Sequence, residues 1–263
     1  MIDFHTHIYP DALAPRALKA AGMNWPFQTD AGLAGQLRLM EQYHIRKCAA
    51  LCIANRPDEQ ENVNRFAMHI QGAGGGRIAA FGSVHPYAKD AAETIERLYG
   101  AGIRGIKFQP MRQRFQADED VCRPLYRKIG ELGMICVFHC GRDVRENRYH
   151  VLPEHMERIV GEFAGGPVIC AHMGGAFLKL REMRRLAALP VYVDTALSAW
   201  YMGQAKFNAA VELFGPRRVL FGTDMPWAAM DRELDYIRHL PLSEEDKERI
   251  LDGNAQELLD RCT

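Results

Sequence analysis

The 263-residue sequence has no excess of charge of either sign, because 33 lysines and arginines balance 33 aspartates and glutamates. A balanced chain has no general attraction for nucleic acid or for an anionic membrane surface, so we expect neither as a partner. No apolar run reaches the roughly 18 residues that a membrane-spanning helix needs. A basic segment of the kind that opens a signal peptide is also missing ahead of the first apolar run.

The seven cysteines are odd in number and lie mostly inside apolar runs such as KCAALCI, MICVFHC and VICAH. Cysteines in such runs are typical of small buried core residues rather than of a disulfide framework. Free buried thiols suit a reducing compartment. The sequence therefore predicts a cytoplasmic protein.

Internal repeats, low-complexity tracts and an interdomain linker are all lacking, so we expect one domain over residues 1–263. Apolar runs alternate with amphipathic helical stretches, and the runs are residues 2–7, 48–53, 78–84, 105–109, 134–139, 167–172, 191–196 and 218–224. Eight strands, each followed by a helix, predict an α/β protein with a (β/α)₈ TIM barrel. A doubly wound open sheet is the alternative, but no Gly-x-Gly-x-x-Gly pattern follows any of the runs.

Polar residues gather at the C-terminal ends of the expected strands, which is the face where barrels of this type build active sites. In the run 105–109, Ile106 and Phe108 should face the surrounding helices, which turns the two polar residues of that run inward. The polar set is His5, His7, Lys107, Gln109, His139, His172, Asp194 and Asp224.

Each of these residues has an ordinary explanation when it is taken alone. A single histidine in an apolar strand is more often a hydrogen-bonded core residue, and an aspartate after a strand often caps a helix. Several ionisable groups at one rim of one barrel would, however, be costly to bury without a cation to neutralise them. The pattern therefore favours a metal site.

Four motifs in this order, FHTH, FHCG, AHMGG and FGTDMPW, resemble the amidohydrolase superfamily of metal-dependent barrel hydrolases. Within it, the chain is similar to the branch that includes aminocarboxymuconate-semialdehyde decarboxylase-like enzymes and related lactonases, from Asp3 to Asn254 and Ala255. The resemblance implies that His5, His7, His139 and Asp224 bind a metal ion. It also implies that His172 is a catalytic residue beside the metal.

Three neutral imidazoles and a carboxylate suit Zn²⁺ best, and Mn²⁺, Fe²⁺ or Ni²⁺ would also be accepted. Binuclear relatives carry a bridging group on the fourth strand, often a carboxylated lysine or a glutamate. GIRGIKFQP has no acidic residue, so we expect one metal ion, with Lys107 the only candidate bridge. Lys107 could instead meet a substrate anion as an ammonium group, and Gln109 replaces a histidine that many relatives carry.

The segment after the fifth strand, CGRDVRENRYH, brings a cluster of basic side chains to the expected site. It indicates recognition of a carboxylate or phosphate, unless the arginines pair with Asp143 and Glu146 of the same segment. Trp227 offers an apolar wall. The expected substrate is a small acidic or cyclic metabolite, and its candidate contacts are Lys107, Gln109, Arg142, Arg145, Arg148, His150 and Trp227.

Three functions are compatible with this site. The first is hydrolysis of an amide, ester or lactone by a metal-activated water, with Asp224 handling the proton of that water and His172 polarising a carbonyl oxygen. The alternative is non-oxidative decarboxylation of a small carboxylic acid, and the third is a non-catalytic metal-binding role. Barrels of this size often pair through their helices, so a homodimer is a candidate assembly.

Overall fold

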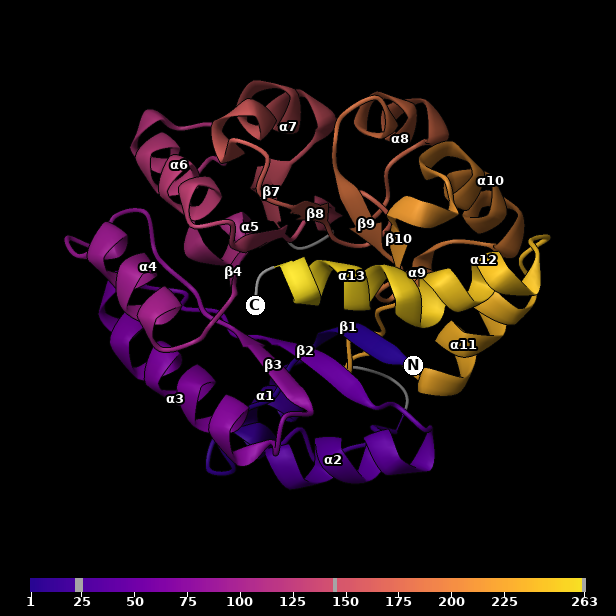
Figure 1. Ribbon diagram of the computed structural model, residues 1–263, viewed down its shortest axis with the longest axis horizontal. Coiled ribbons are helices and arrows are strands. Elements are labelled where there is room, and N and C mark those ends of the chain that lie inside the picture. The colour runs from indigo at the N-terminus through magenta and orange to yellow at the C-terminus, as the bar shows by residue number, and fades with distance from the viewer. Residues whose placement is uncertain (22–25, 144–145, 262–263) are drawn as a thin grey trace.

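A ring of parallel strands surrounded by helices forms the centre of the molecule (Figure 1), and the computed structural model describes residues 1–21, 26–143 and 146–261. One sheet joins β1 (Ile2–Thr6), β2 (Lys47–Leu51) and β3 (Ile78–Phe81) in that order. The other has the order β10 (Val219–Leu220), β9 (Tyr192–Asp194), β8 (Val168–Cys170), β5 (Ile135–Phe138) and β4 (Gly105–Phe108). Parallel bridges between Thr6 and Met225 and between Gly82 and Ile106 join the sheets into a closed ring. The predicted (β/α)₈ barrel is confirmed.

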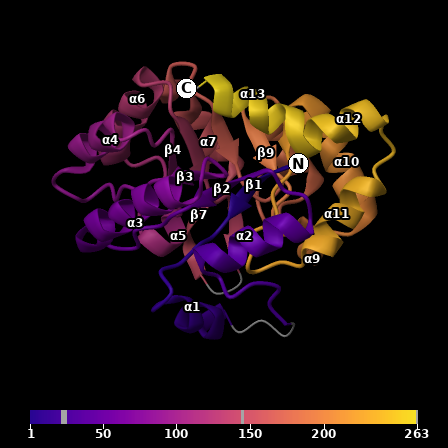
Figure 2. The same cartoon turned by 60° about the horizontal axis from the view of Figure 1, so that its bottom comes forward.

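Helices form the outer layer, and α13 (Asn254–Arg261) crosses the N-terminal mouth of the barrel (Figures 1 and 2). The outer helices are α2 (Leu33–Gln42), α3 (Gln60–Ala73), α4 (Ala91–Gly100), α6 (Arg123–Glu131), α7 (Pro153–Ile159), α8 (Leu180–Ala187), α10 (Gln204–Phe214), α11 (Met230–Arg238) and α12 (Glu244–Glu248). The connections at the opposite end contain α1 (Ala14–Ala21), α5 (Pro110–Gln113), α9 (Ser198–Tyr201) and an antiparallel hairpin of β6 (Gly141–Asp143) and β7 (Glu146–Val151).

The apolar core has two layers, because successive strand residues point to opposite faces. The outer layer packs strand residues such as Ile106 and Phe108 against the helices. The inner layer fills the N-terminal half of the barrel with residues such as Phe4 and Val137. Leu258 of α13 packs against this layer at the N-terminal mouth. The apolar filling leaves the C-terminal end of the barrel to polar side chains.

Lys107 follows this alternation, since its neighbours Ile106 and Phe108 belong to the outer layer. Its side chain is therefore directed into the barrel, as predicted, and it is only 1% exposed.

A bulge in β1 sets the direction of its histidines. Asp3 pairs with Cys48 and Thr6 with Ala50, so three steps along β1 match two along β2. Such an extra residue re-aims the side chains around it. Phe4 can therefore fill the barrel while its neighbour His5 also points to the C-terminal site. His5 and His7 lie two residues apart and would share a face of a regular strand. Both do point to the C-terminal site, but the bulge rather than strict alternation sets that direction.

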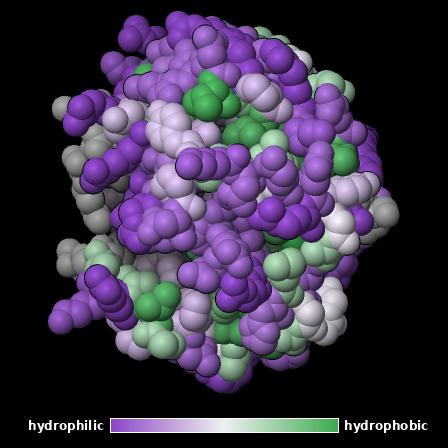
Figure 3. Space-filling model, turned by 90° about the vertical axis from the view of Figure 1, so that its left-hand side faces the viewer, coloured by the Kyte–Doolittle hydropathy of each residue, from purple (hydrophilic) through white to green (hydrophobic). Residues whose placement is uncertain are grey.

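The outer surface over α3, α4 and α6 is mostly hydrophilic, with scattered apolar side chains (Figure 3). Within the described ranges, the structure contains no helix with the length and apolarity needed to cross a membrane.

Asp3 fastens β1 to the segment after β10. Its Oδ1 accepts hydrogen bonds from the backbone N–H groups of His5 (3.2 Å) and Thr223 (3.0 Å), and its Oδ2 lies 2.6 Å from the Thr223 hydroxyl. Burial raises the pKa of Asp3 from 3.8 to about 7, although the Thr223 side chain and these backbone N–H groups act to lower it.

We expect the substitution Asp3→Asn to change how stability depends on pH. A pKa raised on folding gives stability that is complete below pH 4 and is lost as pH rises through 7. The wild-type protein should therefore lose, relative to the variant, on the order of a few kcal/mol of unfolding free energy between pH 5 and pH 8. Chemical denaturation in the presence of a chelator measures this difference. The exposed Asp120→Asn is the control, and a difference independent of pH would contradict the shifted pKa.

Candidate metal centre

Three side chains that the sequence analysis named as metal ligands converge at the C-terminal end of the barrel. The Nε2 atom of His7 lies 3.0 Å from Oδ1 of Asp224, and Nε2 of His5 lies 3.3 Å from the same oxygen. His5 and His7 come from β1 and the residues that follow it, and Asp224 comes from the segment after β10. All three are buried, and their ligand atoms lie close enough together to hold one ion.

Hydrogen bonds on the other ring nitrogen fix how these histidines are protonated. Nδ1 of His7 lies 2.9 Å from the carbonyl oxygen of Leu51, and Nδ1 of His5 lies 2.8 Å from Oδ2 of Asp194. Both Nδ1 atoms must donate, so in the neutral rings each Nε2 carries a lone pair. Lone pairs on two nitrogens then face a carboxylate oxygen, and Nε2 of His5 has no hydrogen-bond partner among the described residues. This donor set fits a cation.

Asp194, at the end of β9, contacts His5, and its place in the sequence alone gave it no role. Besides orienting His5, its Oδ1 accepts hydrogen bonds from the backbone N–H groups of His172 (2.8 Å) and Ala196 (3.2 Å). Asp194 also forms a second possible metal-binding group with His5 and His172. The only sequence signal was its place at the C-terminal end of a strand.

His172 and His139 form a pair beside these groups. Nδ1 of His172 lies 3.0 Å from the carbonyl oxygen of Ala196, so Nδ1 donates and Nε2 is the acceptor. That Nε2 lies 3.0 Å from Nδ1 of His139. His139 therefore contacts His172, and its ring nitrogens are not among the atoms that converge on Asp224. Its role as a metal ligand stays a prediction.

Left-handed backbone re-aims two of these residues. Ala171 faces the barrel interior, so a regular strand would turn His172 outward. Instead His172 and Met173 have φ angles of 62° and 52°. Asp224 has a φ of 70°. Such conformations are costly for residues other than glycine and concentrate at functional sites.

Burial sets the charges of the cluster. It lowers the pKa of His5 and of His139 well below the ordinary value of 6.5, so both are neutral imidazoles at pH 7. Burial alone would raise the pKa of Asp224, but the positive charge of His5 and His7 in their protonated forms outweighs burial and lowers that pKa to about 2. Neutral imidazoles and an ionised carboxylate are the forms that bind a metal ion.

Gly222 makes room for His5. A Cβ atom at this position would lie 2.8 Å from Cβ of His5 and 3.4 Å from Cβ of Asp194. The glycine of the FGTD motif thus allows three strands to approach closely at the metal centre.

Lys107 lies on the inner face of β4 with no hydrogen-bond partner for its Nζ in the described structure. Burial lowers its pKa, while the carboxylates of Asp194 and Asp224 act to raise it. Gln109 follows β4 and directly precedes α5, and its backbone N–H donates to Oε1 of Gln113 over 2.8 Å.

The structure gives a contact for two arginines of the basic segment after β5. Arg142 forms an ion pair with Glu182 (2.6 Å), a residue outside the segment, and Arg148 lies over the ring of Tyr149. His150 lies on β7, and Arg145 falls outside the described residues. Trp227 packs edge-on against Tyr9 and Phe27. The roles of these side chains in substrate binding stay predictions.

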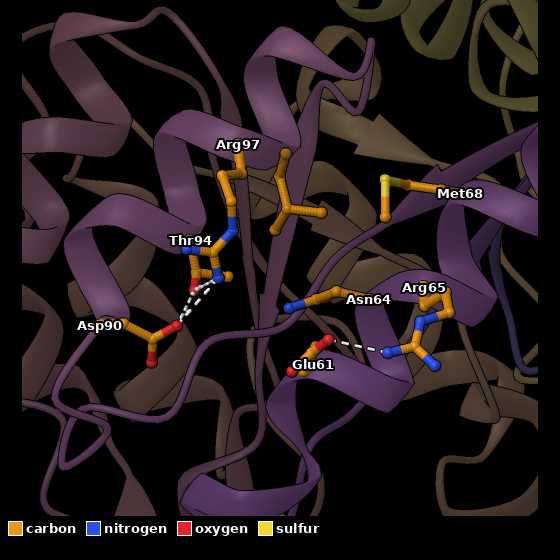
Figure 4. Close-up of a pocket in the computed structure, with 8 residues that line it drawn as sticks. Glu61, Asn64, Arg65, Met68, Asp90, Thr94 and Arg97 are labelled. Atoms are coloured by element: carbon orange, nitrogen blue, oxygen red, sulfur yellow. Dashed lines mark hydrogen bonds and ion pairs between the residues drawn. The ribbon is translucent and has the colours of Figure 1, made fainter.

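A surface groove between α3 and α4 lies away from this centre (Figure 4). Its charged side chains pair with one another, Arg65 with Glu61 (2.7 Å) and Arg97 with Asp90 (2.9 Å). The groove is therefore a solvated outer surface rather than a second candidate site.

Comparisons with known proteins agree with the geometry. A family model described as Amidohydrolase matches residues 2–261. The 6-methylsalicylic acid decarboxylase of Penicillium expansum is 23% identical, over 99% of this chain and 96% of its own length.

Two solved structures share the fold. A dihydroxybenzoic acid decarboxylase from Polaromonas sp., crystallised with manganese and the inhibitor 2-nitroresorcinol, has a TM-score of 0.72 and 17% identity, covering 98% of this chain and 96% of its own. A Pseudomonas putida protein provisionally assigned as a 2-pyrone-4,6-dicarboxylic acid hydrolase has a TM-score of 0.72 and 17% identity, covering 99% and 97%.

The close approach at Gly222 predicts that Gly222→Ala weakens metal binding. The added methyl group must displace His5 or β10, and a misplaced ligand typically costs roughly 10- to 100-fold in metal affinity. Competition with a chromophoric chelator measures the affinity. Gly72→Ala, at a helical position with open space around it, is the control. Equal affinities in wild type and Gly222→Ala would show that His5 does not bind the metal.

Asp194→Asn should also weaken metal binding, for a different reason. An amide whose NH₂ group faces Nδ1 of His5 moves the ring proton to Nε2, where it blocks the metal lone pair. We expect a loss of affinity of roughly 10- to 100-fold with little change in the melting temperature of the metal-free protein. An unchanged affinity would contradict the tautomer assigned to His5.

Proposed function

Because the chain belongs to the amidohydrolase family, we propose that it is a metal-dependent enzyme that removes CO₂ from a small carboxylic acid. The curated relative that matches nearly the full chain is a decarboxylase, and so is the similar structure that holds manganese. These similarities support non-oxidative decarboxylation, which the sequence offered as the alternative to hydrolysis. Hydrolysis becomes the second candidate.

The observation that carries the proposal is the meeting of the Nε2 lone pairs of His5 and His7 with Oδ1 of Asp224 in a buried site. These residues would hold one divalent ion, and His139 is proposed as a further ligand. The sequence favours Zn²⁺, while the related manganese structure makes Mn²⁺ an equal candidate. A bound divalent ion supplies a Lewis acid for the oxygens of an acidic substrate.

Decarboxylation replaces a carboxylate by a hydrogen atom, so the site must deliver one proton to carbon. His172 suits this task once its Nε2 has taken up a proton from solvent, because Ala196 holds the Nδ1 proton in place and leaves Nε2, beside His139, as the atom that can gain and give one. Asp224 is the other group that could hold a proton next to the ion. Burial around both residues keeps bulk water from competing for the reacting carbon.

Hydrolysis of a lactone stays the second candidate, supported by the likeness to the provisionally assigned Pseudomonas putida hydrolase. Hydrolysis would consume a water molecule, and its ring-opened product would be heavier than the lactone by one water. Decarboxylation would instead release CO₂. The two reactions are separated by their products.

We expect CO₂ release from hydroxybenzoic acids when the protein is loaded with Mn²⁺ or Zn²⁺. The panel should include 6-methylsalicylate and 2,6-dihydroxybenzoate, with 2-pyrone-4,6-dicarboxylate as the lactone. Coupled CO₂ detection and mass spectrometry of the products provide the readouts, and chelator-treated protein is the control. Ring opening of the lactone with no CO₂ from any acid would replace the proposed decarboxylase by a hydrolase.

His172→Asn should separate metal binding from chemistry. We expect a nearly full metal content with kcat reduced by roughly two to four orders of magnitude, the usual worth of a positioned proton donor. Elemental analysis and CO₂ release are measured on the same preparation, with the exposed His239→Asn as the control. Loss of the metal from His172→Asn would make His172 a ligand, through the group that it forms with His5 and Asp194.

A further inference from the structure

Lys107 is an ionisable residue at the metal centre to which the contacts described so far give no role. Its Nζ is fully buried and has no hydrogen-bond partner among the described residues. An ammonium group in that state has lost its hydrating water without gaining a hydrogen-bond partner, which destabilises the folded protein. A residue kept at such a cost is expected to serve a ligand.

The position of Lys107 limits what that ligand can be. Its side chain points into the barrel from β4, and the carboxylates of Asp194 and Asp224 are close enough to favour its charged form. Both carboxylates already have other partners. Asp194 contacts Nδ1 of His5 and the backbone N–H of His172, and Asp224 contacts Nε2 of His5 and of His7. The ammonium group therefore remains available to a bound molecule.

The charge balance of the site with one divalent ion bound also favours an anionic ligand. By formal charge, the carboxylates of Asp194 and Asp224 in this donor set balance one divalent ion. The positive charge of Lys107 is then left over in a buried space. A ligand with one negative charge restores neutrality, and a neutral isostere does not.

We propose that Lys107 is the specificity-determining residue of this site, which binds an anionic oxygen of the substrate and so selects monoanionic carboxylic acids over neutral molecules of the same shape. This inference deepens the proposed function and rests on the metal centre described above. It assigns Lys107 a plain ammonium group rather than a carboxylated, metal-bridging form. The fourth strand has no acidic residue that could pair with Lys107, which agrees with this role.

The test compares binding of salicylate and salicylamide, which differ by a carboxylate and a neutral amide, to the manganese-loaded protein by calorimetry. Lys107→Met keeps the length of the side chain and removes the charge. We expect it to weaken salicylate binding by about 10- to 100-fold, as for loss of a hydrogen bond to a charged group, and salicylamide binding by less than threefold. Lys206→Met, at a half-buried lysine that donates to the carbonyl of Leu178, is the control.

A second readout guards against a merely structural effect. Removing an uncompensated buried charge should leave the melting temperature of the ligand-free variant equal to or above that of the wild type. Equal weakening of both ligands with a lowered melting temperature would make Lys107 a structural residue and overturn the proposal. An intact mass showing carboxylation together with two metals per chain would overturn it as well.

These readouts do not depend on turnover. If the binding difference appears while no acid loses CO₂, the proposed decarboxylation fails and the role of Lys107 stands. If CO₂ is released while Lys107→Met binds salicylate as the wild type does, only the inference about Lys107 fails.

Discussion

Two imidazole nitrogens facing one carboxylate oxygen in a buried site are the constraint on which this end of the barrel depends. The hydrogen bonds from Nδ1 of His5 and His7 leave both Nε2 atoms as acceptors, within 3.3 Å of Oδ1 of Asp224. Acceptors repel one another unless a cation or a proton lies between them. The bulge of β1, the left-handed Asp224 and the missing side chain at Gly222 all bring these atoms together.

The sequence was sufficient to predict the barrel, because its eight apolar runs become the eight strands of the ring and alternate with helices as predicted. It also predicted that His5, His7 and Asp224 meet. The alternation of side chains along a strand does not predict the direction of His5 or His172. A bulge changes the direction at His5, and left-handed backbone changes it at His172. Neither irregularity has a period that a sequence pattern would reveal.

Contacts between side chains distant in sequence were harder to foresee. Asp194 holds His5 from 189 residues away, and only the closed barrel shows that their strand ends meet. The composition of the segment after β5 predicts that its arginines bind a substrate anion, and this stays a prediction. Arg142 pairs with Glu182 of α8, a partner that the local sequence did not suggest.

The site departs from the most stable arrangement in several places at once. Buried Asp3, unpartnered Lys107 and the left-handed backbone of His172 each cost stability, and all lie at the C-terminal end of the barrel or brace it. Burial of the apolar residues in the N-terminal half of the barrel, next to α13, contributes stability. Anomalous diffraction at the manganese edge, from crystals of the manganese-loaded protein, tests the central claim most directly. The account predicts one strong peak per chain between Nε2 of His5, Nε2 of His7 and Oδ1 of Asp224, whereas no peak there, or a peak elsewhere, would contradict it.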